Sequence, residues 1–130
     1  MMIGKKGKTM DKITLNGIVY VPETEIEKFA KAAEMDGMKY CIVRTYSAGV
    51  FAGYVESRNG QEVVLRNVRR IWYWSGACSL SQLAKDGAAY PDKCKFAVEV
   101  DKIEVLQAIE IIECTEKARQ AIESVPEWKV

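Results

Sequence analysis

The apolar and polar positions at the start of the chain predict a hairpin followed by a helix. Short apolar runs flank Asn16 and Gly17, a pair that accepts the positive φ angles of a type I′ turn, so this stretch predicts a β-hairpin. Thr24 then caps a predicted helix that runs to about residue 35 and ends at Asp36 and Gly37. Residues 11–37 are therefore expected to form a hairpin-and-helix unit.

From Met38 onward the spacing of apolar residues changes to the alternation of apolar and polar positions expected of β-strands. Strands are predicted over residues 38–46, 50–56, 61–66, 69–74, 96–100 and 103–112. Ser79 caps a short helix that Gly87 ends, and Thr115 caps a last helix. The pattern predicts an α+β fold, with a meandering antiparallel β-sheet, an N-terminal hairpin and helix, a short middle helix and a C-terminal helix.

The chain length suits one globular domain with a small appendage. We expect a disordered leader over residues 1–10, the hairpin and helix over residues 11–37, and an α+β core that carries any binding site over residues 38–130. Because a lone hairpin is marginal in water, the N-terminal unit is expected to dock on the core or on a second subunit.

Composition narrows the classes of function. A net charge of +1 gives no strong overall field toward a membrane or a nucleic acid polymer. No apolar run reaches the roughly 18 residues of a membrane helix, and no signal peptide is recognised, so we expect a cytoplasmic protein. The cysteines have no close spacing and the chain has no His, so we expect reduced core thiols, no metal site and no cofactor.

Catalysis is not expected. A chain without His lacks the commonest general base near neutral pH, and neither a P-loop nor a nucleophile-elbow motif is present. Two glycines in the stretch Ser47–Gly53 predict a bend between strands or a close backbone approach to a ligand. We therefore predict a binding protein with no catalytic residue; a nucleotide hydrolase with a carboxylate base is the enzymatic alternative.

The segment Arg66–Gly76 is rich in arginine and aromatic residues. If it is a strand, alternation places Arg70, Trp72 and Trp74 on one face. A guanidinium binds phosphate through two parallel hydrogen bonds and an indole stacks on a base, so this face suits a nucleotide. The structural alternative is that the tryptophans belong to the core and the arginines extend along it to water. Further phosphate ligands are expected among Arg44, Arg58, Lys93 and Lys95.

Several segments resemble one family in the same order along the chain. They are Val43–Gly53, Asn67–Ala77, Ser79–Ala84, Pro91–Phe96 and Ile109–Lys117. Together they make residues 38–117 similar to the phage family called Thoeris anti-defence protein one. The arginine-aromatic segment and the Ser-Leu-Ser-Gln segment are the most specific of these.

The resemblance implies a protein that binds a signal and does not cleave it. Members of the family sequester the glyco-cyclic ADP-ribose made by TIR-domain proteins of the Thoeris defence. Some also hold cyclic oligonucleotides of the CBASS defence at separate sites, in a hexamer built from dimers. The family pocket involves the Ser-Leu-Ser-Gln helix and the following loop, which by motif alignment implies ligand contacts at Leu83 and Lys93. Relatives have an aromatic residue and an Asn at these two positions.

The expected function is therefore a cytoplasmic sponge for a small cyclic nucleotide in an infected or lysogenic bacterial host, acting as a dimer or hexamer. The expected ligand contacts are Arg44, Arg58, Arg70, Trp72, Trp74, Leu83 and Lys93. The alternative from another class is a module for single-stranded nucleic acid, in which Arg and Trp side chains line a groove along the sheet.

Overall fold

The computed structural model describes residues 13–15, 18–20 and 32–129. The chain divides into two compact units, Met1–Ala30 and Lys31–Val130. In the first unit, strands β1 (Ile13–Leu15) and β2 (Ile18–Tyr20) pair antiparallel. This pairing confirms the predicted hairpin. Most of the helix predicted from Thr24, and the leader predicted over residues 1–10, lie outside the described residues.

Asp36 and Gly37 form a tight turn at the start of the second unit. Met35 and Met38 exchange backbone hydrogen bonds across the turn, with N···O distances of 3.1 and 2.9 Å. The φ angles of Asp36 and Gly37 are 53° and 80°, both positive as a type I′ turn requires. The prediction that this pair ends a helix is therefore wrong. Positive φ suits a helix end and a hairpin turn equally, so the local sequence did not separate the two.

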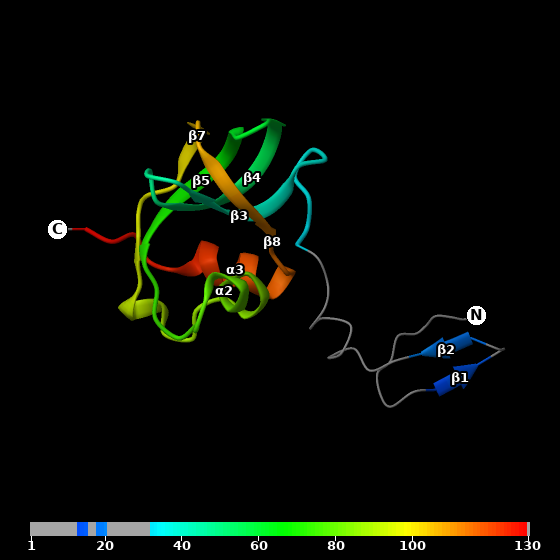
Figure 1. Ribbon diagram of the computed structural model, residues 1–130. Helices are drawn as coiled ribbons and strands as arrows, with labels where there is room; N and C mark the ends of the chain where they lie inside the picture. The colour runs from blue at the N-terminus through cyan, green and yellow to red at the C-terminus, as the bar shows by residue number, and fades with distance from the viewer. Residues whose placement is uncertain (1–12, 16–17, 21–31, 130) are drawn as a thin grey trace. The chain divides into compact units, whose positions relative to one another are not determined.

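The second unit is a six-stranded antiparallel sheet with helices on one side (Figure 1), which confirms the predicted α+β class. The strand order is β6-β5-β4-β3-β8, and β7 pairs with β5 next to β6. The strands are β3 (Lys39–Thr45), β4 (Val50–Asn59), β5 (Glu62–Tyr73), β6 (Lys95–Phe96), β7 (Val100–Val105) and β8 (Ala108–Glu113). The helices are α2 (Leu80–Asp86), the 3₁₀ turn η2 (Pro91–Lys93) and α3 (Glu116–Ser124).

The sheet is curled. Strands β7 and β8 pair with different parts of the sheet, β5 and β3, yet only Leu106 and Gln107 connect them. The Ala108 amide also donates to the Gln61 carbonyl at 2.9 Å, which draws β8 toward the turn between β4 and β5. Inside the curl lies one of two apolar clusters, formed by Cys41, Val43, Phe51, Val63, Leu65, Val68, Val105 and Ala108.

Two strand boundaries differ from prediction. Residues 61–66 and 69–74, predicted as two strands, form the single strand β5. Pairing with β4 continues on both sides of a bulge, where Asn67 takes a positive φ of 46° and the register shifts opposite Gly53. Conversely, the strand predicted over residues 103–112 is broken at Leu106 and Gln107, and that over 96–100 is reduced to the two residues of β6 and the start of β7.

Both predicted helix caps in the second unit are confirmed. The side chain of Ser79 accepts from the Gln82 amide, and that of Thr115 accepts from the Ala118 amide. The two helices pack on the face of the sheet opposite the curl, over a second cluster that includes Tyr40, Ile42, Ala52, Leu83 and Ile122. No helix in the described ranges is long and apolar enough to cross a bilayer.

Candidate functional site

The guanidinium of Arg70 lies between two aromatic rings near the end of β5. Phe51 of β4 is the register partner of Arg70, and its ring centre is 4.7 Å from the guanidinium carbon. The ring of Trp72 is 5.5 Å from the same carbon. Both distances fit cation–π contacts, so the rings orient the charged group. We call Phe51, Arg70 and Trp72 the Arg70 platform.

Arg70 differs from the other arginines in its polar contacts. Within residues 32–129 its guanidinium has no hydrogen-bond or ion-pair partner, and its Nε is buried without one. Each of the others has at least one polar partner within the protein: Arg44 has Glu110, Arg58 the Gly60 carbonyl, Arg66 Glu56 and Asp101, Arg69 main-chain carbonyls, and Arg119 Glu116 and Glu123. Because no carboxylate pairs with it, the Arg70 guanidinium is available to bind an oxyanion from solution.

Only two of the three residues predicted to share a face do so. Trp72 is 59% exposed and contacts Arg70, whereas Trp74 is half-buried and packs against the helix-side cluster that contains Ile71. Strand β5 ends at Tyr73, and its register with β6 shifts between Ile71 and Tyr73. Strict alternation therefore stops before Trp74, and the predicted shared face is corrected to Arg70 and Trp72.

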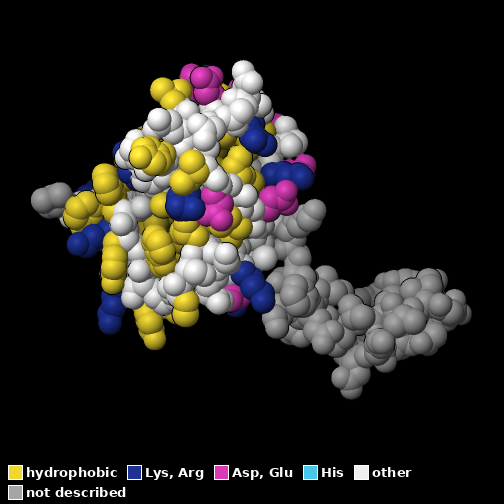
Figure 2. Space-filling model, in the orientation of Figure 1, with side chains coloured by type: hydrophobic (Ala, Val, Ile, Leu, Met, Phe, Trp, Pro, Cys, Tyr) yellow, Lys and Arg dark blue, Asp and Glu magenta, His cyan; other side chains and the backbone are white. Residues whose placement is uncertain are grey.

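Basic and aromatic side chains also alternate around β6 and η2. Lys95 Nζ lies 5.4 Å from the Trp128 ring centre, and Lys93 Nζ lies 5.5 Å from that of Tyr90. Tyr73 is the register partner of Lys95 and is exposed. On the side where the chain ends, Figure 2 shows hydrophobic and basic side chains next to one another. Lys93 is exposed, and its role as a ligand contact stays a prediction.

The remaining predicted contacts are dispersed. Arg44 is exposed on β3 and its Nε is 3.0 Å from Glu110, so its charge is already paired. Arg58 lies near the end of β4 and donates to the Gly60 carbonyl at 2.8 Å. Leu83 is fully buried among the core residues between α2 and the sheet. The structure therefore gives this leucine a packing role and places it away from any surface ligand.

An open hollow lies beside α2, in the region where the resemblance implies a pocket. Its volume is about 740 Å³. Small residues form most of its wall, with a few polar side chains; the lining residues are Gly76, Ala77, Cys78, Gln82, Asp86, Gly87, Ala88, Ala89, Lys117 and Ala121. Lys117 and Asp86 are 3.7 Å apart, so the positive charge here has an acidic neighbour. Sequence reasoning missed Lys117, because only the fold brings α3 to the loop after α2.

The described residues contain no group of three or more His, Cys, Asp or Glu side chains that could hold a metal ion. The Arg70 platform offers a ligand the Arg70 cation and the exposed indole of Trp72, because Phe51 is fully buried and only orients the guanidinium. This combination binds an anion attached to a flat ring by electrostatic attraction and stacking.

Comparison with known proteins gives a single family. Its model, described as "Domain of unknown function (DUF6948)", matches residues 38–122. The matched span runs from just before β3 into α3 and so includes the Arg70 platform and the hollow beside α2. No curated protein and no solved structure matches the chain. The chain belongs to the DUF6948 family.

Proposed function

We propose that this protein binds a small cyclic nucleotide of the cyclic ADP-ribose type and sequesters it without cleaving it, in the cytoplasm of a phage-infected bacterial host. The observation that carries the proposal is the Arg70 guanidinium, which is held between Phe51 and Trp72 and has no polar partner within residues 32–129. The resemblance of residues 38–117 to a family of signal-binding phage proteins supports the same ligand class.

Arg70 and Trp72 each have a counterpart in such a ligand. The pyrophosphate accepts hydrogen bonds from the Arg70 guanidinium, and a charge-assisted bond of this kind contributes about 1.5–3 kcal/mol. The exposed indole of Trp72 stacks on the base, which contributes about 1–3 kcal/mol. Lys93 and Lys95 add positive charge near the same end of β5.

Calorimetric titration with glyco-cyclic ADP-ribose tests the site. We expect Arg70→Ala to weaken binding by about tenfold or more and Trp72→Ala by about fivefold or more, as losses of roughly 1.5 and 1 kcal/mol require. Arg44→Ala is the matched control, since this arginine is exposed on the same sheet but already paired with Glu110. Wild-type affinity in folded Arg70→Ala would refute the platform as the site. Loss of binding in Lys117→Ala alone would move the ligand to the hollow beside α2.

A second measurement separates sequestration from hydrolysis. A sponge protects a downstream effector in proportion to the number of its sites, and heating the complex returns the intact ligand. A hydrolase removes the signal progressively at a protein-to-ligand ratio of about one to a hundred, because turnover distinguishes catalysis from binding. Mass spectrometry of the heated supernatant detects which of the two occurs.

The cation–aromatic contacts at Lys93 and Lys95 favour single-stranded nucleic acid as a second candidate ligand. Salt distinguishes the two candidates. Binding of a polyanion weakens steeply as salt rises because counterions are released, whereas binding of a compact ligand weakens much less. A steep salt dependence with an oligonucleotide, and no binding of the cyclic nucleotide, would favour this second function.

A further inference from the structure

Strand β8 has one edge without a strand partner in the described part of the chain. On its other edge it pairs antiparallel with β3, from Cys41 opposite Glu113 to Thr45 opposite Ala108. Two of its isoleucines are exposed, Ile109 at 43% and Ile111 at 36%. An edge strand with exposed apolar residues is a template for pairing with another chain.

The other outer strands of the sheet are protected. Strand β7 has charged, exposed residues at Asp101, Lys102 and Glu104, which oppose the approach of another strand. Strand β6 has only two residues. Val100 at the start of β7 is also exposed, at 38%, so β8 differs from the other outer strands in having two exposed apolar residues.

The acidic residues of β8 are neutralised by its neighbour β3. Glu110 accepts from Arg44 Nε at 3.0 Å, and Glu113 lies 3.4 Å from Lys39 Nζ. Two copies of β8 therefore approach one another with both acids of each strand already paired. This charge balance removes the like-charge repulsion that otherwise keeps identical edges apart.

Space for a partner strand exists beside β8. A groove of about 480 Å³ runs along residues 108–111, with Arg58, Gly60 and Gln61 on its other side. The Ala108 amide already donates to the Gln61 carbonyl, so the groove closes at that end of β8. The groove therefore extends from that hydrogen bond along Ile109 to Ile111.

We propose that β8 pairs antiparallel with β8 of a second copy of this chain, with Ile111 next to the two-fold axis. In this register Ile111 faces Ile111 of the partner, and Glu110 faces the partner's Ile112, so no glutamate faces a glutamate. An interface of this kind is isologous, as two-fold dimers require. The inference does not depend on the proposed ligand, because it uses the edge of the sheet and not the Arg70 platform.

A single cysteine at the axis tests the pairing. Directly opposed residues in an antiparallel pair have Cα atoms about 4.5–5.5 Å apart, within the range that a disulfide bridges. The exposed Cys78 is first replaced by Ser, so that it cannot form a disulfide between copies; the other three cysteines are buried. In this background Ile111→Cys is expected to form a disulfide-linked dimer under mild oxidation, while Lys102→Cys on β7 remains uncrosslinked. Equal crosslinking of the two variants would overturn the proposal.

Light scattering of the full chain gives an independent readout. Ile111→Lys should halve the solution mass, because it places two like charges at the axis. Leu106→Lys is the control: this residue is more exposed than Ile111, at 65%, but lies in the loop before β8. An unchanged mass in Ile111→Lys, or an equal fall in both variants, would contradict edge pairing. If Ile111→Lys does not fold, the cysteine experiment still decides.

Discussion

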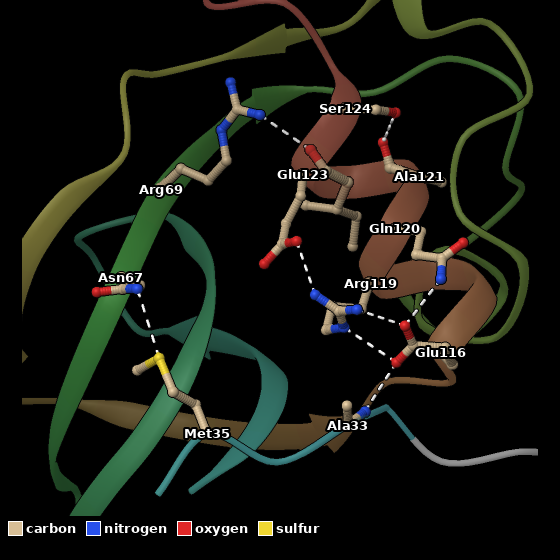
Figure 3. A network of polar contacts seen from close by, with 11 residues as sticks. Ala33, Met35, Asn67, Arg69, Glu116, Arg119, Gln120, Ala121, Glu123 and Ser124 are labelled. Atoms are coloured by element: carbon tan, nitrogen blue, oxygen red, sulfur yellow. Dashed lines mark hydrogen bonds and ion pairs between the residues drawn. The ribbon is translucent and has the colours of Figure 1, made fainter.

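The guanidinium of Arg69 donates a hydrogen bond of 2.9 Å to the main-chain carbonyl of Ile122, in α3. The same nitrogen donates to the Val125 carbonyl at 2.8 Å, and Nε donates to the Ala97 carbonyl at 2.9 Å. Figure 3 shows Arg69 extending from β5 toward the last turn of α3. The side chain is buried, which lowers its pKa, and it donates to two carbonyls at the end of the helix, of which that of Ile122 also accepts from the Val125 amide at 3.3 Å. One arginine thus joins β5, α3 and the chain after β6.

Arg69→Ala should destabilise the protein strongly. It leaves the buried Val125 carbonyl without a donor, leaves that of Ile122 with only the Val125 amide at 3.3 Å, and opens a cavity, so we expect a loss of about 3 kcal/mol in the free energy of unfolding. Urea denaturation measures this loss. Arg66→Ala is the control, since its ion pairs with Glu56 and Asp101 are at the surface and such pairs contribute about 1 kcal/mol or less. Similar losses in both variants would refute the role assigned to Arg69.

Gly53→Ala should also destabilise the sheet. A Cβ at this position would lie 2.8 Å from Val68 Cβ and 2.9 Å from Val68 Cα, so backbone must move. Overpacking of this kind costs about 1–3 kcal/mol. Gly60→Ala is the comparison: its added Cβ meets no atom within 4 Å, and only its positive φ of 64° carries a cost, about 1–2 kcal/mol. Thermal melts that rank Gly60→Ala as the more damaging change would disprove this account.

Glu116 should make stability depend on pH below about 5. Hydrogen bonds from Arg119, then from the Ala33 amide and Gln120, lower its pKa from 4.5 to about 2. A carboxylate with a lowered pKa stabilises the fold fully above its usual pKa, and this contribution is lost as pH falls toward 2. Glu116→Gln is expected to be less stable at pH 7 and to show a smaller decline between pH 5 and 2. The test is a series of urea titrations, with Glu110→Gln as control; parallel wild-type and Glu116→Gln curves would contradict it.

One thiol should react much faster than the others in the native protein. Cys78 is exposed, while Cys41, Cys94 and Cys114 are buried. Burial raises the pKa of Cys41 to about 11 and that of Cys114 to about 12, so few thiolates are present at pH 8. Brief treatment with iodoacetamide is expected to add one label, located at Cys78 by peptide mass spectrometry, and four labels after denaturation. Rapid labelling of Cys114 in the native state would show that the helix-side core opens.

Local signals in the sequence predicted the elements that depend on local chemistry. Asn16 with Gly17 indicated a hairpin, and Ser79 and Thr115 indicated helix starts, because each acts through atoms within a few residues of itself. The Arg70 and Trp72 pair was also found from sequence, since both lie within one strand where alternation holds.

Features that depend on contacts between distant segments were not predictable in this way. The bend at Asn67 is accommodated by Gly53 on a neighbouring strand, and the curl of the sheet sets the break between β7 and β8. The lack of a partner for Arg70 within residues 32–129 follows from where every carboxylate in that range lies in the fold. The burial of Leu83 likewise depends on how α2 packs on the sheet, and motif alignment carries no information on that packing.

The pairing of β3 with β8 has a consequence for synthesis of the chain. Lys39 and Glu113, which meet across these strands, are 74 residues apart in sequence. At the usual 5–20 residues per second, a ribosome adds that length in about 4–15 seconds. During this interval β3 has left the ribosome with one edge bare, although it is an inner strand of the finished sheet. The nascent chain is therefore most exposed to aggregation and to chaperones at a strand that the folded protein conceals.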